Sequence, residues 1–249
     1  MQPGLRIIPV PVDQDGLDVA AALKLAPRAK LAYITPANQF PLGVTMAADR
    51  RMGLLNWAAT AGAWIIEDEY DSEYCYYGHP VAALQSLDRS GSVIYVGTFT
   101  KMLFNALRLG FMVLPQRLVS SFEAPRSFVD RHPSTLEQAI LAEFITEGHF
   151  GYHVRKVRQI YGERMSALKA ASDKQLGDLL ELVNAPSGMR TLAWLKIPSE
   201  DKTAAERARM LGLEIIALST FAIKHSQKPG LVLGFAGCSP SELSRGVSA

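Results

Sequence analysis

The chain has 249 residues, of which 48% are hydrophobic and 20% are charged, and its formal net charge is +2 at pH 7. This composition supports a buried core and excludes intrinsic disorder, and the charge is too small to indicate nucleic-acid binding by itself. Two cysteines in unrelated contexts indicate neither a disulfide framework nor a zinc site. The cysteines fit a reducing cytoplasm, where we expect the protein. No apolar run has the length of a membrane span and no signal-peptide pattern opens the chain, so no membrane contact is expected.

The first half of the chain alternates apolar strands with helices. Strands are predicted at 5–13, 30–35, 63–68, 92–99 and 109–115, and helices at 16–26 and 46–62. Nearly continuous apolar strands separated by helices are typical of a parallel or mixed sheet buried on both faces. Ligands of such sheets bind at the carboxyl ends of the strands, where polar residues gather in this sequence.

From about residue 116 the pattern changes to consecutive helices, followed by a mixture of short strands and helices. The short strands are predicted at 180–186, 191–197, 213–218 and 231–235, with a helix at 202–212. We therefore predict a large α/β domain over residues 1–155 and a small α+β domain over residues 156–249. Both ends of the chain look abrupt. A short native protein is one explanation, but we expect a piece of a longer chain.

The motif GTFTK places Lys101 just after a predicted buried strand, next to the hydroxyls of two threonines. A partly desolvated lysine has a lowered pKa, which favours Schiff-base chemistry, although a solvated loop lysine is the simpler alternative. Arg108 follows seven residues later. Together with Thr98 and Thr100 it offers the donors of a phosphate site, unless it is an ordinary surface arginine.

The acidic run EDEYDSEY, residues 67–74, follows another apolar strand. An unpaired carboxylate at the end of a buried strand is unfavourable, so Asp68 needs a partner such as a protonated ring nitrogen. Tyr70 could point its hydroxyl at the same ligand. A helix cap, an acidic loop and a Mg²⁺ site are alternatives for this run.

Taken together, these motifs resemble the aminotransferase-like domain of the MocR branch of GntR-type transcriptional regulators. The resemblance is carried by residues 34–51, 65–88 and 93–115, and more weakly by residues 230–247. It implies the α/β fold of fold-type-I pyridoxal phosphate (PLP) proteins: a mixed, mostly parallel sheet with helices on both faces and a small α+β C-terminal domain. It also implies truncation at the N-terminus, with DNA bound only through a winged-helix domain outside this chain.

The resemblance also implies roles for individual residues. Lys101 would hold PLP covalently, Asp68 would pair with the protonated pyridine nitrogen, and Tyr70 would bond the phenolic oxygen. Thr98, Thr100 and Arg108 would bind the phosphate.

Two positions depart from the pattern of related enzymes. Phe40 stands where they have an asparagine, so Asn38 or Gln39 is the candidate to reach the phenolic oxygen. The last strand lacks the arginine that usually binds a substrate carboxylate. Arg190 is the nearest candidate, with a solvated strand-end arginine as the alternative.

The resemblance therefore predicts a PLP-binding effector domain that responds to an amino acid or amine and forms a homodimer. Because part of the usual phosphate site lies outside this sequence, the isolated chain is expected to hold PLP weakly or to need a partner. An aminotransferase and an inert, cofactor-free fragment are the competing interpretations. No metal site is expected, because His149 and His153 have no further ligands nearby in the sequence. Asp71, Ser72 and Glu73 are expected to cap or brace their loop.

Overall fold

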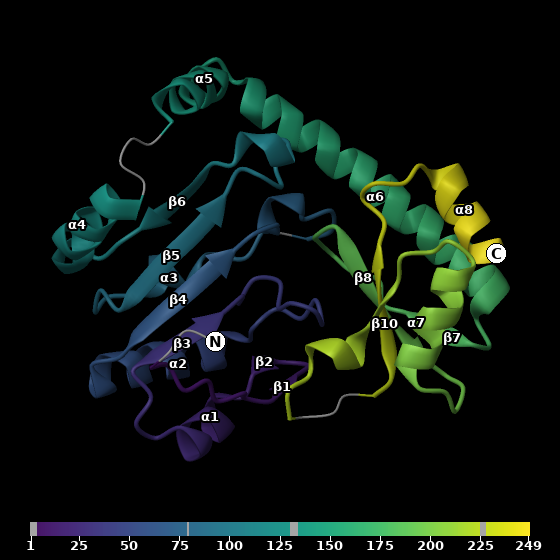
Figure 1. Cartoon of the computed structure of the whole chain (residues 1–249), viewed down its shortest axis with the longest axis horizontal. Helices are drawn as coiled ribbons and strands as arrows, with labels where there is room; N and C mark the ends of the chain where they lie inside the picture. The colour runs from purple at the N-terminus through teal and green to yellow at the C-terminus, as the bar shows by residue number, and fades with distance from the viewer. Residues whose placement is uncertain (1–3, 79, 130–133, 225–227) are drawn as a thin grey trace.

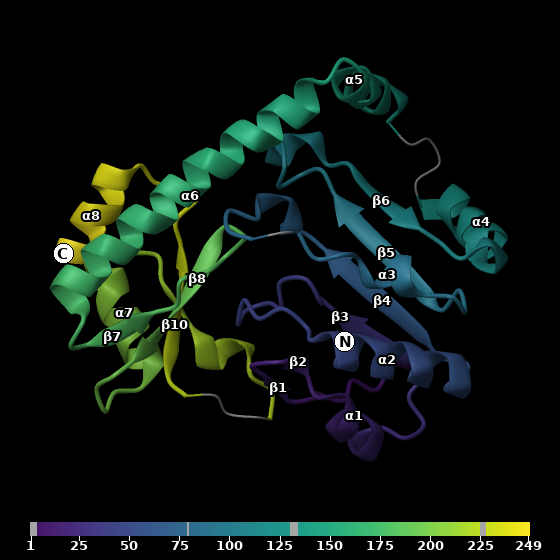
Figure 2. The same cartoon turned by 180° about the vertical axis from the view of Figure 1, so that it is seen from behind.

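The computed structural model describes residues 4–78, 80–129, 134–224 and 228–249. Two four-stranded sheets lie side by side, and a long helix runs from the edge of the first to the second (Figure 1). The reverse view shows the same arrangement (Figure 2). The two parts meet at the loops that follow strands of the first sheet, and these loops hold predicted site residues such as Tyr70 and Lys101.

The first sheet has the order β3-β4-β5-β6. Its strands are β3 (Leu31–Ile34), β4 (Trp64–Glu69), β5 (Val93–Thr98) and β6 (Gly110–Val113). The strands β3, β4 and β5 are parallel, and β6 is antiparallel to β5. The predicted mixed, mostly parallel sheet is therefore confirmed. Because parallel strands end at the same edge, the residues that follow β4 and β5 become neighbours.

Helices α1 (Val19–Leu25), α2 (Ala48–Ala61) and α3 (Leu84–Leu87) belong to this half of the molecule. Leu54 and Ala58 of α2 pack with Ile65 and Val93 of the sheet in one buried core. The helix α2 ends at Gly62, whose left-handed backbone (φ 57°) lets its N–H bond the carbonyl of Ala58.

The other face of the sheet is less covered. The side chain of Tyr33 on β3 is 62% exposed, and that of Met112 on β6 is 51% exposed. Tyr33 thus stands where a ligand can reach it.

The second sheet is antiparallel throughout and has the order β7-β8-β10-β9. Its strands are β7 (Leu180–Leu182), β8 (Arg190–Leu195), β9 (Ile216–Ala217) and β10 (Gly230–Gly234), and its helices are α6 (His149–Leu176), α7 (Asp201–Met210) and α8 (Pro240–Ser248). Met165 and Leu168 of α6 pack against Ala193 of β8 and Leu243 of α8. This half has its own core, as expected for a small α+β unit.

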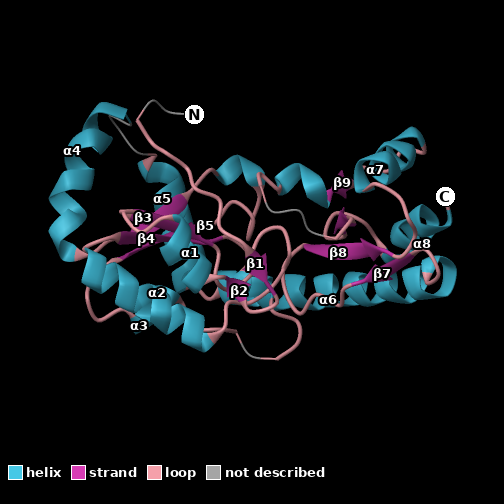
Figure 3. Cartoon of the chain, turned by 90° about the horizontal axis from the view of Figure 1, so that it is seen from below, coloured by secondary structure: helices cyan, strands magenta, loops and turns pink. Residues whose placement is uncertain are grey.

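The predicted domain division between residues 155 and 156 falls within the continuous helix α6. The division remains a prediction. Seen from below, α6 extends beneath the second sheet (Figure 3). The remaining elements are α4 (Val119–Val129), α5 (Thr135–Thr146) and the short pair β1 (Val12–Asp13) and β2 (Gly16–Leu17).

The strand predicted over residues 5–13 is reduced to β1. Pro9 and Pro11 lack the N–H groups that a longer strand would need for its ladder. The segment before β1 is therefore irregular along most of its length.

Within the described ranges, no helix combines the length and the apolar character needed to cross a lipid bilayer.

Candidate functional site

Strand β4 sorts the acidic run by the alternation of its side chains. Glu67 and Glu69 are buried, whereas Asp68 between them is only partly buried. Glu67 is 0% exposed and accepts backbone N–H bonds from Leu84 (2.6 Å) and Gln85 (2.8 Å) at the start of α3. Because neighbouring side chains on a strand point to opposite faces, Asp68 faces away from Glu67. Glu67 is therefore structural, and Asp68 is available to the cavity described below.

Asp68 is bonded by a residue that the sequence did not single out. The hydroxyl of Tyr33, at the end of β3, donates to Oδ2 of Asp68. Although Tyr33 is more than half exposed, partial burial, and then the bond to Asp68, raise its pKa to about 12. The tyrosine thus stays protonated at neutral pH and remains a donor to the carboxylate.

Lys101 lies in the turn after β5, and its backbone is fixed from two sides. The hydroxyl of Tyr74, a fully buried residue of the acidic run, shares its one hydrogen between the carbonyl oxygens of Lys101 (3.0 Å) and Met102 (3.2 Å). From α6, Nε2 of His153 donates to the same Met102 carbonyl at 2.9 Å. The lysine therefore stands on an anchored turn.

The side chain of Lys101 lies over an aromatic ring. Its Nζ is 4.1 Å from the ring centroid of Tyr70, within the range of a cation–π contact. Burial is the main cause that lowers the pKa of Lys101 and Arg190 adds to it, while Asp71 and Asp68 oppose the change. A lowered pKa increases the fraction of neutral amine, which is the nucleophilic form.

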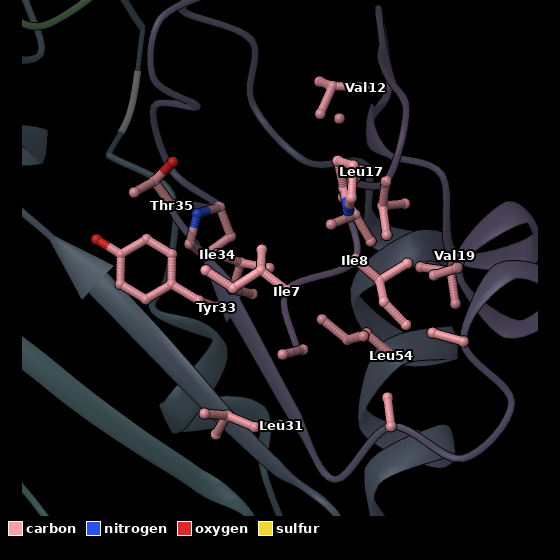
Figure 4. A pocket seen from close by; sticks show the side chains of 18 of the residues that line it. Ile7, Ile8, Val12, Leu17, Val19, Leu31, Tyr33, Ile34, Thr35 and Leu54 are labelled. Carbon is pink, nitrogen blue, oxygen red and sulfur yellow. The ribbon is translucent and has the colours of Figure 1, made fainter. Parts of the chain in front are cut away.

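A cavity of about 1160 Å³ opens beside these residues. Asp68, Tyr70, Lys101 and Arg190 are among the polar residues that line it, together with Tyr33 and Gln39. Its apolar part is shown in Figure 4, where side chains of the first residues, β3, α1 and α2 surround it, among them Ile7, Ile8, Val19, Ile34 and Leu54. The sequence-predicted Lys101, Asp68 and Tyr70 are thus brought together on one cavity.

Asn38 lies in a second, much smaller cavity of about 30 Å³, which it lines together with Tyr70, Asp71, Lys101 and Arg190. Its Nδ2 donates to Oδ1 of Asp71 at 2.8 Å, and its carbonyl accepts the hydroxyl of Tyr70 at 2.8 Å. A tyrosine hydroxyl has a single hydrogen, so Tyr70 has no donor left for a ligand in this conformation. The Asn38 amide keeps one further N–H.

The three residues predicted to bind phosphate are not among those that line either cavity. Thr98 Oγ1 accepts the backbone N–H of Thr100 at 3.2 Å, so the two threonines form a local turn next to Lys101. Arg108 is exposed, and its φ of 50° makes it the one non-glycine residue with a left-handed backbone in the described part of the chain. Such strained positions cluster at functional sites.

Arg190 stands across the cavity from the sheet, at the first residue of β8. Its Cζ is 5.6 Å from the ring centroid of Phe40, the residue that occupies the expected asparagine position. Within the described residues its guanidinium has no hydrogen bond and no ion pair. The donors of Arg190 are therefore free for an anion.

No group of three or more His, Cys, Asp or Glu side chains in the described ranges is arranged to hold a metal ion. His149 is instead paired with Glu147, 3.1 Å from Nε2 to Oε2, and His153 bonds the Met102 carbonyl.

The fold and the strand-end site define a class: the structure has the fold of PLP-dependent aminotransferases of fold type I. Over 96% of this chain and 61% of the other, it superposes on the kynurenine aminotransferase of Pyrococcus horikoshii, solved in complex with PMP, with a TM-score of 0.87 and 26% identity.

In sequence the chain is similar to transcriptional regulators. It is 38% identical over 246 residues, 99% of the chain, to the probable rhizopine catabolism regulatory protein MocR of Rhizobium meliloti, of which it covers 50%. It is 36% identical over 243 residues, 98% of the chain, to the HTH-type transcriptional regulator YdeL of Bacillus subtilis, of which it covers 52%. The resemblance predicted from the sequence is confirmed, and the chain spans about half the length of these relatives. No protein-family model matches it.

Proposed function

We propose that this chain is the PLP-binding, aminotransferase-like effector and dimerisation domain of a MocR-type transcriptional regulator. DNA binding would be performed by another part of the full protein, in the cytoplasm. Similarity to two regulators along nearly the whole chain, together with an aminotransferase fold, supports this assignment. The observation that supports PLP binding is that Lys101 and Asp68, at the ends of adjacent strands, line the same cavity.

Lys101 and Asp68, which line the large cavity, fit the aldehyde and the ring nitrogen of PLP. Lys101 has the lowered pKa that an amine needs to attack an aldehyde, and Oδ1 of Asp68 has no partner within the described residues. Asp68 would hold the proton on the pyridine nitrogen. Arg108, with Thr98 and Thr100, would bind the phosphate. When bound, PLP supplies an aldehyde for amines and a ring that withdraws electrons.

Tyr70 and Asn38 would act on the phenolic oxygen of PLP. The Asn38 amide keeps a free N–H, whereas the Tyr70 hydroxyl is engaged with the Asn38 carbonyl. Contact between Tyr70 and PLP would therefore require that hydroxyl to turn away from Asn38.

Arg190 points to the class of effector. A guanidinium with free donors, held over Phe40 and facing the same cavity as Lys101, is suited to a carboxylate. The proposal is thus that the effector is an amino acid rather than a simple amine. Such an effector acts as a switch only to the extent that it binds two conformations of the protein with different affinities.

The test is an absorbance titration of the chain with PLP. We expect a visible absorption band in the wild type and in Lys156→Ala, which removes an exposed lysine of α6. The band should be lost in Lys101→Ala. No band at saturating PLP, or an equal band in Lys101→Ala, would contradict the proposal.

Two further measurements address the other parts of the assignment. Turnover of amino acids with 2-oxoglutarate would identify an aminotransferase instead of an effector domain. Light scattering of the chain should give the mass of a dimer, and a monomer at all concentrations would remove the dimerisation role.

A further inference from the structure

Asp71 has a position that the proposed PLP contacts do not explain. It lies two residues beyond β4, its side chain is only 4% exposed, and its Oδ1 accepts the Asn38 amide at 2.8 Å. It also lines the small cavity together with Lys101 and Arg190. A buried carboxylate is unfavourable unless hydrogen bonds and opposite charges compensate for lost hydration.

Two cations, Lys101 and Arg190, share this cavity. Because like charges repel, a nearby negative charge stabilises two cations that share one space. Asp71 or Lys101 interacts electrostatically with the following charged or titratable groups: Asp68, Glu69, Tyr70, Glu73, Tyr74, Tyr76 and Arg190, and Asp71 and Lys101 also act on each other. Asp71 is the carboxylate that lines the same small cavity as both cations.

The Asn38–Asp71 pair is also one of the places where the two halves of the molecule touch. An added Cβ on Gly188 would lie 2.6 Å from Nδ2 of Asn38 and 2.8 Å from Oδ2 of Asp71. Gly188 donates its N–H to the carbonyl of Tyr74 at 3.1 Å, and Arg190 follows two residues later. The segment that carries Arg190 therefore rests directly on this hydrogen-bonded pair.

We propose that Asp71 is a positioning residue and the buried counter-charge of the site. It holds Asn38 and Gly188 in contact, and its carboxylate keeps the ammonium of Lys101 and the guanidinium of Arg190 facing one cavity. The inference deepens the proposed function, because it concerns the lysine assigned to PLP. It makes a prediction that is independent of the cofactor.

The test measures the pKa of Lys101 in the cofactor-free chain. Competitive acetylation at a series of pH values, followed by mass spectrometry of the Lys101 peptide, gives this value. Replacing the carboxylate in Asp71→Asn should lower the pKa of Lys101 by about one unit, so that about ten times more neutral amine is present below that pKa. The matched control is Glu73→Gln, the same chemical change two residues on, at a group that does not act on Lys101.

A pKa of Lys101 that is the same in Asp71→Asn, in Glu73→Gln and in the wild type would overturn the proposal. The reciprocal measurement does not depend on Asp71→Asn folding. Lys101→Met, which removes the cation from a half-buried site, should raise the pKa of the Asp71 carboxyl, as followed by carbon NMR. An unchanged carboxyl pKa in Lys101→Met would equally contradict it.

The Asn38→Asp/Asp71→Asn double variant exchanges the two groups across the same hydrogen bond. The pKa of Lys101 in the double variant should lie between its values in Asp71→Asn and in the wild type, because a carboxylate returns to the same pair. No recovery would contradict the role of the pair. If these pKa changes are observed but the chain does not bind PLP in the titration, the proposed function is wrong and the role of Asp71 stands.

Discussion

Gly188→Ala is the substitution for which the structure sets the clearest magnitude. The backbone of Gly188 has a φ of +87°, where an L-residue costs about 1 kcal/mol or slightly more. The added Cβ would also fall 2.6 Å from Asn38 and 2.8 Å from Asp71, so this buried hydrogen bond must break or shift. Leaving a buried polar group unsatisfied costs about 1–3 kcal/mol. We expect a total loss of about 2–4 kcal/mol in the free energy of unfolding.

Gly212→Ala separates these two contributions. Gly212 has a similar φ of +80°, but nothing lies within 4 Å of an added Cβ. Urea unfolding of both variants should show Gly212→Ala destabilised by about 1 kcal/mol and Gly188→Ala by about 1–3 kcal/mol more. Equal destabilisation would refute the contact between Gly188 and the Asn38–Asp71 pair. In an Asp71→Ala background the excess should shrink, because one of the two clashing atoms is gone.

Three further predictions concern pH, helix capping and ligand class. Burial raises the pKa of Glu69 from 4.5 to about 7, so the native state keeps a proton that the unfolded chain has released. The free energy of unfolding should therefore fall by up to roughly 3 kcal/mol between about pH 4.5 and about pH 7, and urea unfolding of Glu69→Gln should lack this fall. Ser239→Ala removes the capping box that Ser239 forms with Glu242 at the start of α8, and thermal unfolding should show a loss of about 1 kcal/mol, whereas no change would argue against the cap. Arg190→Met should weaken amino-acid binding to the PLP-loaded chain about tenfold or more without affecting amines that lack a carboxylate, and equal weakening of both would exclude the carboxylate role.

The residues at the strand ends could be predicted because their placement is local. Asp68 and Lys101 each follow an apolar strand directly, and parallel pairing of β4 with β5 brings the two strand ends to the same edge. The alternation within β4 then separates Asp68 from Glu67 and Glu69, which composition alone does not do.

The partners that cross long stretches of chain could not be predicted. The bond from Tyr33 to Asp68 depends on the register of β3 against β4, and the approach of Gly188 and Arg190 depends on how the second sheet sits on the first. In the acidic run, the sequence did not specify the partners that its side chains bond. Asp71 bonds Asn38, and Tyr74, outside the predicted set, holds the Lys101 turn.

The central claim is that Lys101 holds PLP, and the most direct measurement is chemical. The chain is incubated with equimolar PLP, reduced with borohydride, digested and mapped by mass spectrometry. The account predicts a phosphopyridoxyl group on the Lys101 peptide, with the other lysines essentially unmodified. Modification spread over exposed lysines such as Lys156, or none at all, would contradict it.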